Sequence, residues 1–324
     1  MTTPAIRLDR IRKSYGTQLV LDDVDLTVPA GTVTALLGPN GAGKTTTVHI
    51  LSTLVRADAG SASVAGCDVA HDPEGVRAAI GLTGQFSAVD TLLTGEENLL
   101  LMARLRHLGA RRAKARAAGL LEQFDLADAA KKPLSTYSGG MRRRLDLAMT
   151  LVTAPRVIFL DEPTTGLDPR SRHTMWEIVR GLVAEGTTVL LTTQYLDEAD
   201  ELADRIAVLD GGRIVAEGTP DELKRRIPGG HLELRFADAA LLDAGARLLE
   251  TAGRDDTALA LTVPSDGGVA GLRGVLNRLA DADVAVLDVS IHTPDLDDVF
   301  FALTGSTATA GRAGSPDDQE GTAS

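Results

Sequence analysis

A strand, a glycine-rich loop and a helix at residues 32–51 constrain the fold of this chain more than any other segment. Residues 32–37 are an apolar run typical of a buried strand, and residues 46–51 form the first turns of a helical pattern. Between them, residues 38–45 fit the phosphate-loop pattern of a glycine, four residues and then Gly-Lys-Thr. This strand–loop–helix order predicts a loop that binds phosphate.

The residues of this loop suit a nucleoside triphosphate. Its glycines let the backbone approach the phosphates, and its amides and the following helix N-terminus attract the anion. We expect Lys44 to neutralise the β and γ phosphates and Thr45 to place its hydroxyl on Mg²⁺. A glycine turn with an incidental lysine is the alternative. The predicted nucleotide-binding residues of the loop are Gly38, Pro39, Asn40, Gly41, Ala42, Gly43, Lys44, Thr45 and Thr46.

Length and composition limit the remaining possibilities. A chain of 324 residues predicts about two domains. The net charge of −12 disfavours sequence-independent binding of nucleic acid, which needs a positive surface. The single cysteine, Cys67, excludes a disulfide framework and a cysteine-based zinc site, and we interpret it as a small buried residue in a reducing compartment. No run approaches the roughly 18 apolar residues that span a bilayer, so we expect a membrane role only through a partner.

Strand and helix patterns alternate in the first two thirds of the chain. Residues 6–28 alternate apolar and polar positions, which predicts antiparallel edge strands before the phosphate loop. Helical patterns dominate residues 95–150. Strand-like runs return at residues 157–160, 187–191 and 206–209, with helical segments between them. This alternation predicts a mostly parallel sheet covered by helices.

A smaller unit follows a boundary at Pro228-Gly229-Gly230. The preceding segment predicts a hairpin near residues 210–213 and a closing helix at 221–227. The smaller unit has strand patterns at 232–236, 258–263 and 284–291 and helical patterns at 239–252 and 269–281. Thr293 and Pro294 are expected to begin a last short helix and Gly305 to end it. Residues 306–324 carry no apolar pattern and are predicted to be disordered.

Two carboxylates follow the apolar strand at residues 157–160. The strand is expected to deliver Asp161 and Glu162 to the carboxyl edge of the sheet, beside the phosphate loop. There Asp161 can hold Mg²⁺ and Glu162 can polarise the attacking water. Acidic residues also end many ordinary strands at surface turns, so it is the phosphate loop upstream that favours the catalytic interpretation.

A second anion site is predicted at residues 138–140. Ser138 is a good helix cap, and Gly139 and Gly140 expose backbone amides at a helix N-terminus. A capped helix start without a ligand is the alternative.

Together these elements resemble the nucleotide-binding subunit of an ATP-binding cassette (ABC) transporter, over about residues 5–226. Ser138-Gly139-Gly140 resembles the signature motif of this family, with Met141 replacing its usual glutamine. Gln85 stands where the family has a Mg²⁺-sensing glutamine, and Asp168 lies in a segment that resembles the loop crossing the dimer interface. Tyr15 stands where an aromatic ring stacks on adenine, although an ordinary edge-strand tyrosine is the alternative.

The resemblance implies a fold, an activity and partners. The expected fold is an α/β phosphate-loop NTPase cassette at 1–228 with an antiparallel β edge, a helical subdomain at about 86–152, and a small C-terminal α+β domain at 231–305. The expected activity is ATP hydrolysis coupled to transmembrane transport. The expected assembly is a head-to-tail homodimer, or a pair with a second cassette chain, with two ATP molecules between the chains. A separate membrane permease would hold it at the cytoplasmic face of the cell membrane.

One position departs from the common family pattern. Gln194 replaces the histidine of most members, and its amide can donate a hydrogen bond to the γ-phosphate but cannot carry a proton near neutral pH. We therefore expect slow hydrolysis, with Glu162 activating the water and Gln194 acting at most as a positional sensor.

Four segments narrow the resemblance to the daunorubicin/doxorubicin-resistance ATPases, in which this glutamine is typical. They are residues 84–90, 138–146, 193–200 and 296–300. The narrower resemblance implies one half of an exporter for an amphipathic drug or secondary metabolite, with a six-helix permease. Two alternatives from other classes stay open, namely a soluble ABC ATPase acting on ribosomes or DNA, and an importer ATPase.

Several other polar residues are interpreted as structural. Asp297, Asp298 and His292 are expected to be surface or packing residues of the C-terminal unit. Two basic clusters are expected to be solvated helix faces, with contact to the permease or to anionic lipid as the alternative. They are Arg111, Arg112, Lys114 and Arg116, and Arg142, Arg143 and Arg144.

Overall fold

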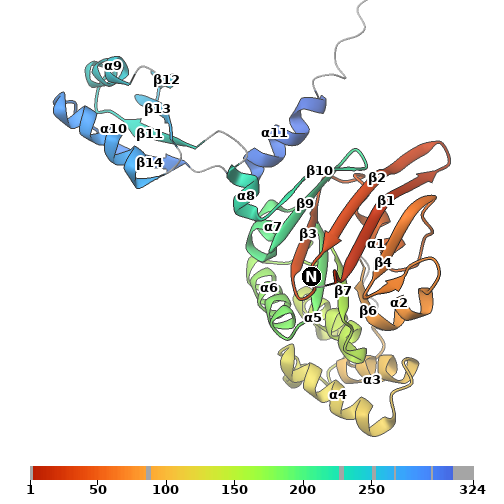
Figure 1. Ribbon diagram of the computed structural model, residues 1–324. Coiled ribbons are helices and arrows are strands. Elements are labelled where there is room, and N and C mark those ends of the chain that lie inside the picture. The colour runs from red at the N-terminus through yellow and green to blue at the C-terminus, as the bar shows by residue number, and fades with distance from the viewer. Residues whose placement is uncertain are drawn as a thin grey trace, which may run out of the picture. The chain divides into compact units, whose positions relative to one another are not determined.

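The computed structural model describes residues 3–84, 89–225, 230–249, 253–265, 268–292 and 295–308. The chain divides into two compact units, Met1–Pro220 and Asp221–Ser324 (Figure 1). Among the described residues, the first unit holds two sheets and the second holds one, and each unit has its own apolar core.

The described part of the first unit is built on a six-stranded sheet. Its strands lie in the order β10 (Arg213–Gly218), β9 (Arg205–Asp210), β3 (Val33–Leu37), β8 (Thr188–Thr193), β7 (Val157–Asp161) and β6 (Ile80–Thr83). The strands from β9 to β6 are parallel, and β10 pairs with β9 as an antiparallel hairpin. Strands β3, β7 and β8 are buried at every residue, as covered parallel strands require. The predicted α/β fold is confirmed.

An antiparallel sheet packs beside it, in the order β2 (Gln18–Val28), β1 (Ile6–Tyr15), β4 (Ala59–Val64) and β5 (Cys67–Asp68). It shares an apolar core with helix α1 (Lys44–Leu51). Cys67 is only partly buried at the margin of this core, so its interpretation as a buried residue was wrong.

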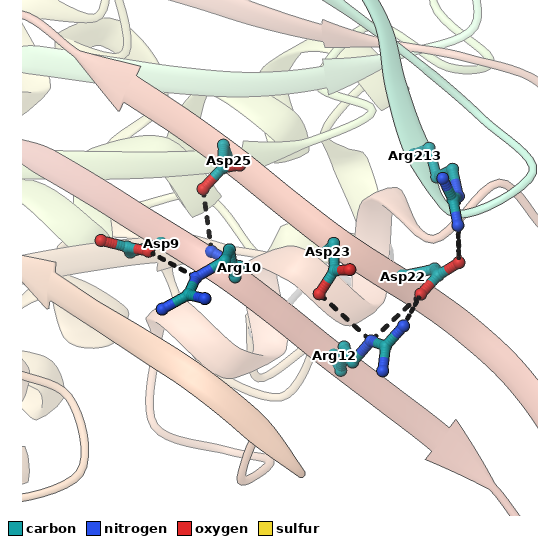
Figure 2. A network of polar contacts seen from close by, with 7 residues as sticks. All are labelled: Asp9, Arg10, Arg12, Asp22, Asp23, Asp25 and Arg213. Carbon is teal, nitrogen blue, oxygen red and sulfur yellow. Dashed lines mark hydrogen bonds and ion pairs between the residues drawn. The ribbon is translucent and has the colours of Figure 1, made fainter.

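Asp22 joins the two sheets of the first unit. Its carboxylate accepts hydrogen bonds from Arg12 of β1 and from Arg213 of β10, as Figure 2 shows. Its backbone N–H donates to the carbonyl of Gly212 at 2.9 Å. The β9–β10 hairpin is therefore attached to the antiparallel sheet by both backbone and charge.

The helices of the first unit connect its strands along the chain, and Figure 1 shows where each of them lies. Helix α3 (Gly95–Leu105) begins with a capping box in which Thr94 and Glu97 satisfy each other's backbone N–H groups. No helix among the described residues is long and apolar enough to cross a bilayer. Besides α1, the described α-helices of this unit are α2 (Pro73–Ala79), α3, α4 (Ala110–Gln123), α5 (Gly139–Thr150), α6 (Pro169–Ala184) and α7 (Leu196–Leu202), and α8 (Pro220–Arg225) follows them.

The second unit contains β11 (His231–Arg235), α9 (Ala239–Leu248), β12 (Gly253–Asp255), β13 (Ala260–Pro264), α10 (Val269–Asp281), β14 (Asp288–His292) and α11 (Leu296–Ala308). Its strands lie in the order β12, β13, β11, β14, with antiparallel pairing throughout. A β-α-β-β-α-β chain in this arrangement is the ferredoxin-like pattern. Phe236 fills the core, and a Cβ on Gly245 would lie 2.7 Å from its ring, so α9 packs closely at that glycine.

Several predicted boundaries in the C-terminal region differ from those of the structure. Helix α9 ends at Leu248 rather than at residue 252, and β14 begins only at Asp288. Helix α11 continues through Gly305 to Ala308. The predictions for Thr293, Pro294 and residues 309–324 lie outside the described residues.

Candidate functional site

Three adjacent parallel strands bring the predicted site residues to one edge of the sheet. Strand β3 leads into the phosphate loop, β7 ends at Asp161, and β8 is followed by Gln194. In the register of the sheet, Asp161 is opposite Thr192, and Thr193 is opposite the last residue of β3. The carboxyl ends of all three strands therefore meet at the loop.

The glycines of the loop are required by close packing. A Cβ on Gly38 would lie 2.2 Å from the carbonyl oxygen of Leu209 in β9. Gly43, which precedes α1, has a φ of 110°, and a Cβ there would lie 2.5 Å from Cδ2 of Leu21 in β2. A side chain at either position would push the loop away from the strands that support it.

The side chain of Lys44 is buried against its own loop. Its Nζ donates to the carbonyl of Gly38 at 2.7 Å and to that of Pro39 at 3.1 Å. Burial lowers the pKa of Lys44, while the negative charges of Glu162 and Asp161 act in the opposite direction. A cation is thus held at the loop, in the field of the acidic pair.

The two carboxylates after β7 have different surroundings. Asp161 accepts a hydrogen bond from Thr45 Oγ1 at 3.2 Å and another from Thr192 Oγ1. Hydroxyl and carboxylate oxygens are the ligands that Mg²⁺ takes, so Thr45 and Asp161 fit such an ion. Glu162 has a φ of 48°, in the left-handed region, and its backbone N–H donates to the carbonyl of Thr192 at 3.0 Å. The left-handed turn places the two acidic residues in different environments.

The second predicted anion site lies at the start of α5. Ser138 caps this helix by accepting a hydrogen bond from the backbone N–H of Met141 at 3.2 Å. Ser138 and Gly139 are exposed, whereas Gly140 is buried, and a Cβ on it would lie 2.5 Å from Ser171 Oγ. Two residues of the motif thus face solvent, while the third packs against α6.

Asp168 caps α6 within its own chain. Its carboxylate accepts from the hydroxyl of Ser171 at 2.6 Å and from its backbone N–H at 3.0 Å. These hydrogen bonds hold the pKa of Asp168 below its usual value. The start of α6 is therefore fixed both by this cap and by the contact with Gly140.

The remaining predicted residues lie around this edge or outside the described residues. Tyr15 ends β1, is 48% exposed, and has Lys13 Nζ 5.4 Å from its ring centroid. Lys13 pairs across the sheet with Leu21, and Leu21 packs against Gly43 of the phosphate loop. The Tyr15 ring therefore lies on the β1–β2 hairpin that supports this loop. Gln194 is partly exposed in the bend between β8 and α7. Gln85 lies outside the described residues.

Comparison with known proteins identifies the family. The family model for the ABC transporter matches residues 21–165. The chain is 54% identical over 306 residues to the daunorubicin resistance ATP-binding protein DrrA2 of Streptomyces coeruleorubidus, covering 93% of this chain and 95% of that protein. The chain belongs to the ATP-binding cassette family of transporter ATPases. Within this family it groups with the daunorubicin/doxorubicin-resistance proteins, which confirms the resemblance described above.

Further relatives support the same family assignment. The chain is 49% identical over 309 residues to the doxorubicin resistance ATP-binding protein DrrA of Mycobacterium tuberculosis, covering 93% of each chain. A solved ATP-binding subunit of an ABC transporter is 31% identical, with a TM-score of 0.62, and covers 69% of this chain and 93% of that one. A dimeric cassette bound to ADP and Pi is 25% identical, with a TM-score of 0.60 and coverage of 66% and 98%. Cassettes of this family bind and hydrolyse ATP, which agrees with the phosphate loop.

Two residues of the cassette, Arg143 and Arg144, were misread from the sequence. Arg143 was expected on a solvated helix face, but its side chain is only 13% exposed and points toward the acidic pair. It also contacts the buried Asp146 at 3.4 Å. Asp146, three residues after Arg143, was the signal available in the sequence, because it marks a buried face of α5.

Arg144 was also expected on a solvated face, but its side chain is 16% exposed and donates to the carbonyls of Phe124 at 2.9 Å and Asp125 at 3.3 Å.

The cluster at residues 111–116 agrees better with the prediction. Arg111, Arg112 and Lys114 are exposed, whereas Arg116 is partly buried and donates to the carbonyl of Leu151 at 2.6 Å. In the second unit, His292 ends β14 and lies 3.5 Å from the carboxylate of Asp298.

Proposed function

We propose that this chain is the ATP-hydrolysing motor of an exporter for an amphipathic drug or secondary metabolite, a class that includes anthracycline-like antibiotics. The observation that carries the proposal is the similarity to the daunorubicin resistance protein over 93% of this chain. The solved cassettes above match only 66% and 69% of it. The similarity to resistance proteins therefore includes the C-terminal unit, which favours this branch over importer and ribosome-associated ATPases.

In the proposed site, each residue has a role in binding or hydrolysing ATP. Lys44 and the loop amides hold the phosphates, and Tyr15 stacks on the adenine. Thr45 and Asp161 would hold Mg²⁺, which would neutralise charge on the phosphates, and Gln85 would sense the ion. Glu162 polarises the attacking water, and Gln194 positions the γ-phosphate.

We propose that two copies of the chain assemble head to tail. Ser138, Gly139 and Gly140 of one copy would bind the nucleotide held by the loop of the other, with Asp168 at the interface. The exposure of Ser138 and Gly139 supports this arrangement, as does the dimeric state of the solved cassette bound to ADP and Pi. A separate membrane permease would hold the pair at the cytoplasmic face of the membrane, and the C-terminal unit would assist assembly or coupling.

A transport assay tests this function. Cells would express the full chain with the permease that copurifies with it from native membranes, and accumulation of anthracyclines and dyes would be compared with that of Lys44→Ala cells. Lower accumulation in cells with the wild-type chain than in Lys44→Ala cells supports ATP-driven export. Equal accumulation of every compound in both strains, with the permease present in the membrane, would contradict drug export and leave a transporter ATPase with a different cargo.

A further inference from the structure

The guanidinium of Arg143 contacts four backbone carbonyl groups at the catalytic edge of the sheet. Its Nε donates to Pro163 at 3.0 Å, and its Nη1 donates to Gly84 at 2.8 Å. Its Nη2 lies 3.1 Å from the carbonyl of Asp161 and 3.2 Å from that of Glu162. One side chain of α5 thus holds three consecutive carbonyls at the end of β7, together with that of the residue directly after β6.

Those three carbonyls surround an unfavourable backbone conformation. Glu162 has a φ of 48°, and a residue with a side chain adopts this region only when its surroundings hold it there. On one side, the N–H of Glu162 is bound to the carbonyl of Thr192 in β8. On the other side, Arg143 holds the carbonyls. The direction of the Glu162 side chain therefore depends on both contacts.

Only arginine supplies the required set of donors. Its planar guanidinium has five N–H groups in a rigid fork, whereas lysine has a compact ammonium and glutamine has a single amide nitrogen. The buried carboxylate of Asp146, which is 2% exposed, compensates the positive charge from the same helix. The guanidinium is consequently kept in place with little contact with solvent.

We propose that Arg143 is a positioning residue for ATP hydrolysis, which holds the turn at Glu162 so that the carboxylate of Glu162 meets the attacking water. Because Arg143 lies on α5, it also ties that turn to the helix whose first residues are Ser138, Gly139 and Gly140. A displacement of α5 would then move Glu162 as well. This inference rests on the proposed role of Glu162 and is independent of the transported cargo.

Steady-state ATPase kinetics of the full-length chain test the proposal. Arg143→Gln is expected to lower kcat by about 10- to 100-fold, the effect of a displacement on the order of 1 Å, and to change KM for ATP by less than about twofold. Arg143→Lys keeps the charge beside Asp146 and is expected to recover part of the lost kcat. The matched control is Arg144→Gln on the same helix, because Arg144 donates to the carbonyls of Phe124 and Asp125 instead.

A double-mutant cycle with Glu162→Gln separates positioning from a general structural effect. If Arg143 acts through Glu162, Arg143→Gln lowers kcat much less in the Glu162→Gln background than in the wild type. Equal losses in both backgrounds, an effect on KM alone, or an unchanged kcat would overturn the proposal. Should Arg143→Gln fail to fold, as judged by thermal unfolding, the same cycle is made with Arg143→Lys and decided by the same criteria.

Discussion

The hydroxyl of Thr45 lies 3.2 Å from the carboxylate of Asp161, although 116 residues separate them in the chain. Thr45 is the second residue of α1, which follows β3, and Asp161 ends β7, two strands away from β3 in the sheet. The contact joins the phosphate-binding and acidic halves of the site, and its oxygen atoms suit a divalent cation.

Removal of this hydroxyl should abolish the effect of Mg²⁺ on nucleotide binding. Thr45→Val keeps the branched shape and loses the oxygen, so we expect ATP affinity in Mg²⁺ to fall by about tenfold or more, to the value measured in EDTA. Thr45→Ser, which keeps the oxygen, is the control and should bind as the wild type does. The check is ATP titration with and without Mg²⁺, and a persistent Mg²⁺ effect in Thr45→Val would contradict the assignment.

Gly43 should tolerate no side chain. Its φ of 110° and the 2.5 Å approach of a Cβ to Leu21 predict that Gly43→Ala costs about 2 kcal/mol or more of stability and displaces the loop. Gly119→Ala is the matched control, because Gly119 lies in α4 with open space around it and should gain about 0.5–1 kcal/mol. Denaturant unfolding and ATP titration measure both effects. An equally stable Gly43→Ala chain would show that the loop packs differently.

Glu198 should make the stability of the chain depend on pH. It is fully buried on α7, and burial raises the pKa of its carboxyl, although the donors of Thr193, Thr164 and Trp176 partly lower it. Its folded-state pKa therefore lies above the unfolded value of about 4.3. Its contribution to stability is complete below the unfolded value and is lost as the pH rises through the folded-state pKa.

Glu198→Gln removes this loss because the amide stays neutral. We expect its Tm to exceed that of the wild type by about 2–4 °C at pH 8 and by less at pH 5. Thermal unfolding at both values provides the measurement, with Glu201→Gln, an exposed position of the same helix, as the control. A Tm difference that does not change between pH 5 and pH 8 would show that the protonation of Glu198 is not linked to folding in this range.

Asp22 should contribute stability that acid removes. Hydrogen bonds from Arg213 and Arg12 lower the pKa of its carboxyl (Figure 2). Its contribution is therefore present above the unfolded value of about 3.9 and is lost as the pH falls through the lower folded-state value. We expect Asp22→Asn to have a lower Tm than the wild type at pH 7 and a smaller deficit at about pH 2.5, below the unfolded value. A deficit that is the same at both values would show that charge is unimportant there.

Because residue 194 is glutamine, the kcat of the wild type should not depend on the ionisation of an imidazole at this position. Gln194→His is expected to introduce a pH dependence of kcat near pH 6.5 that the wild type lacks. Gln194→Ala should lower kcat by about tenfold or more if the amide donates to the γ-phosphate during hydrolysis. The measurement is the pH profile of kcat for the three chains, and unchanged turnover in Gln194→Ala would remove its sensor role.

Local patterns predicted the parts of the site that are continuous in sequence. The loop at residues 38–45 and the pair Asp161–Glu162 each follow a short apolar strand, and parallel strands must end at a common edge, so their meeting could be expected. Helix ends were less predictable. Gly305 was expected to stop α11, but the helix continues to Ala308, because a glycine ends a helix only where the chain turns.

The sequence by itself determined the cassette fold, the nucleotide loop and the family, because each depends on residue types at short spacings. Only the tertiary structure decided that Arg143 is largely buried, that it holds the carbonyls of residues 161–163, and that Glu162 lies in a left-handed turn. The physical reason is that backbone carbonyls are the same at every position, so nothing in the residue types marks which of them a distant guanidinium will reach. That choice is made only when α5 packs against the end of β7.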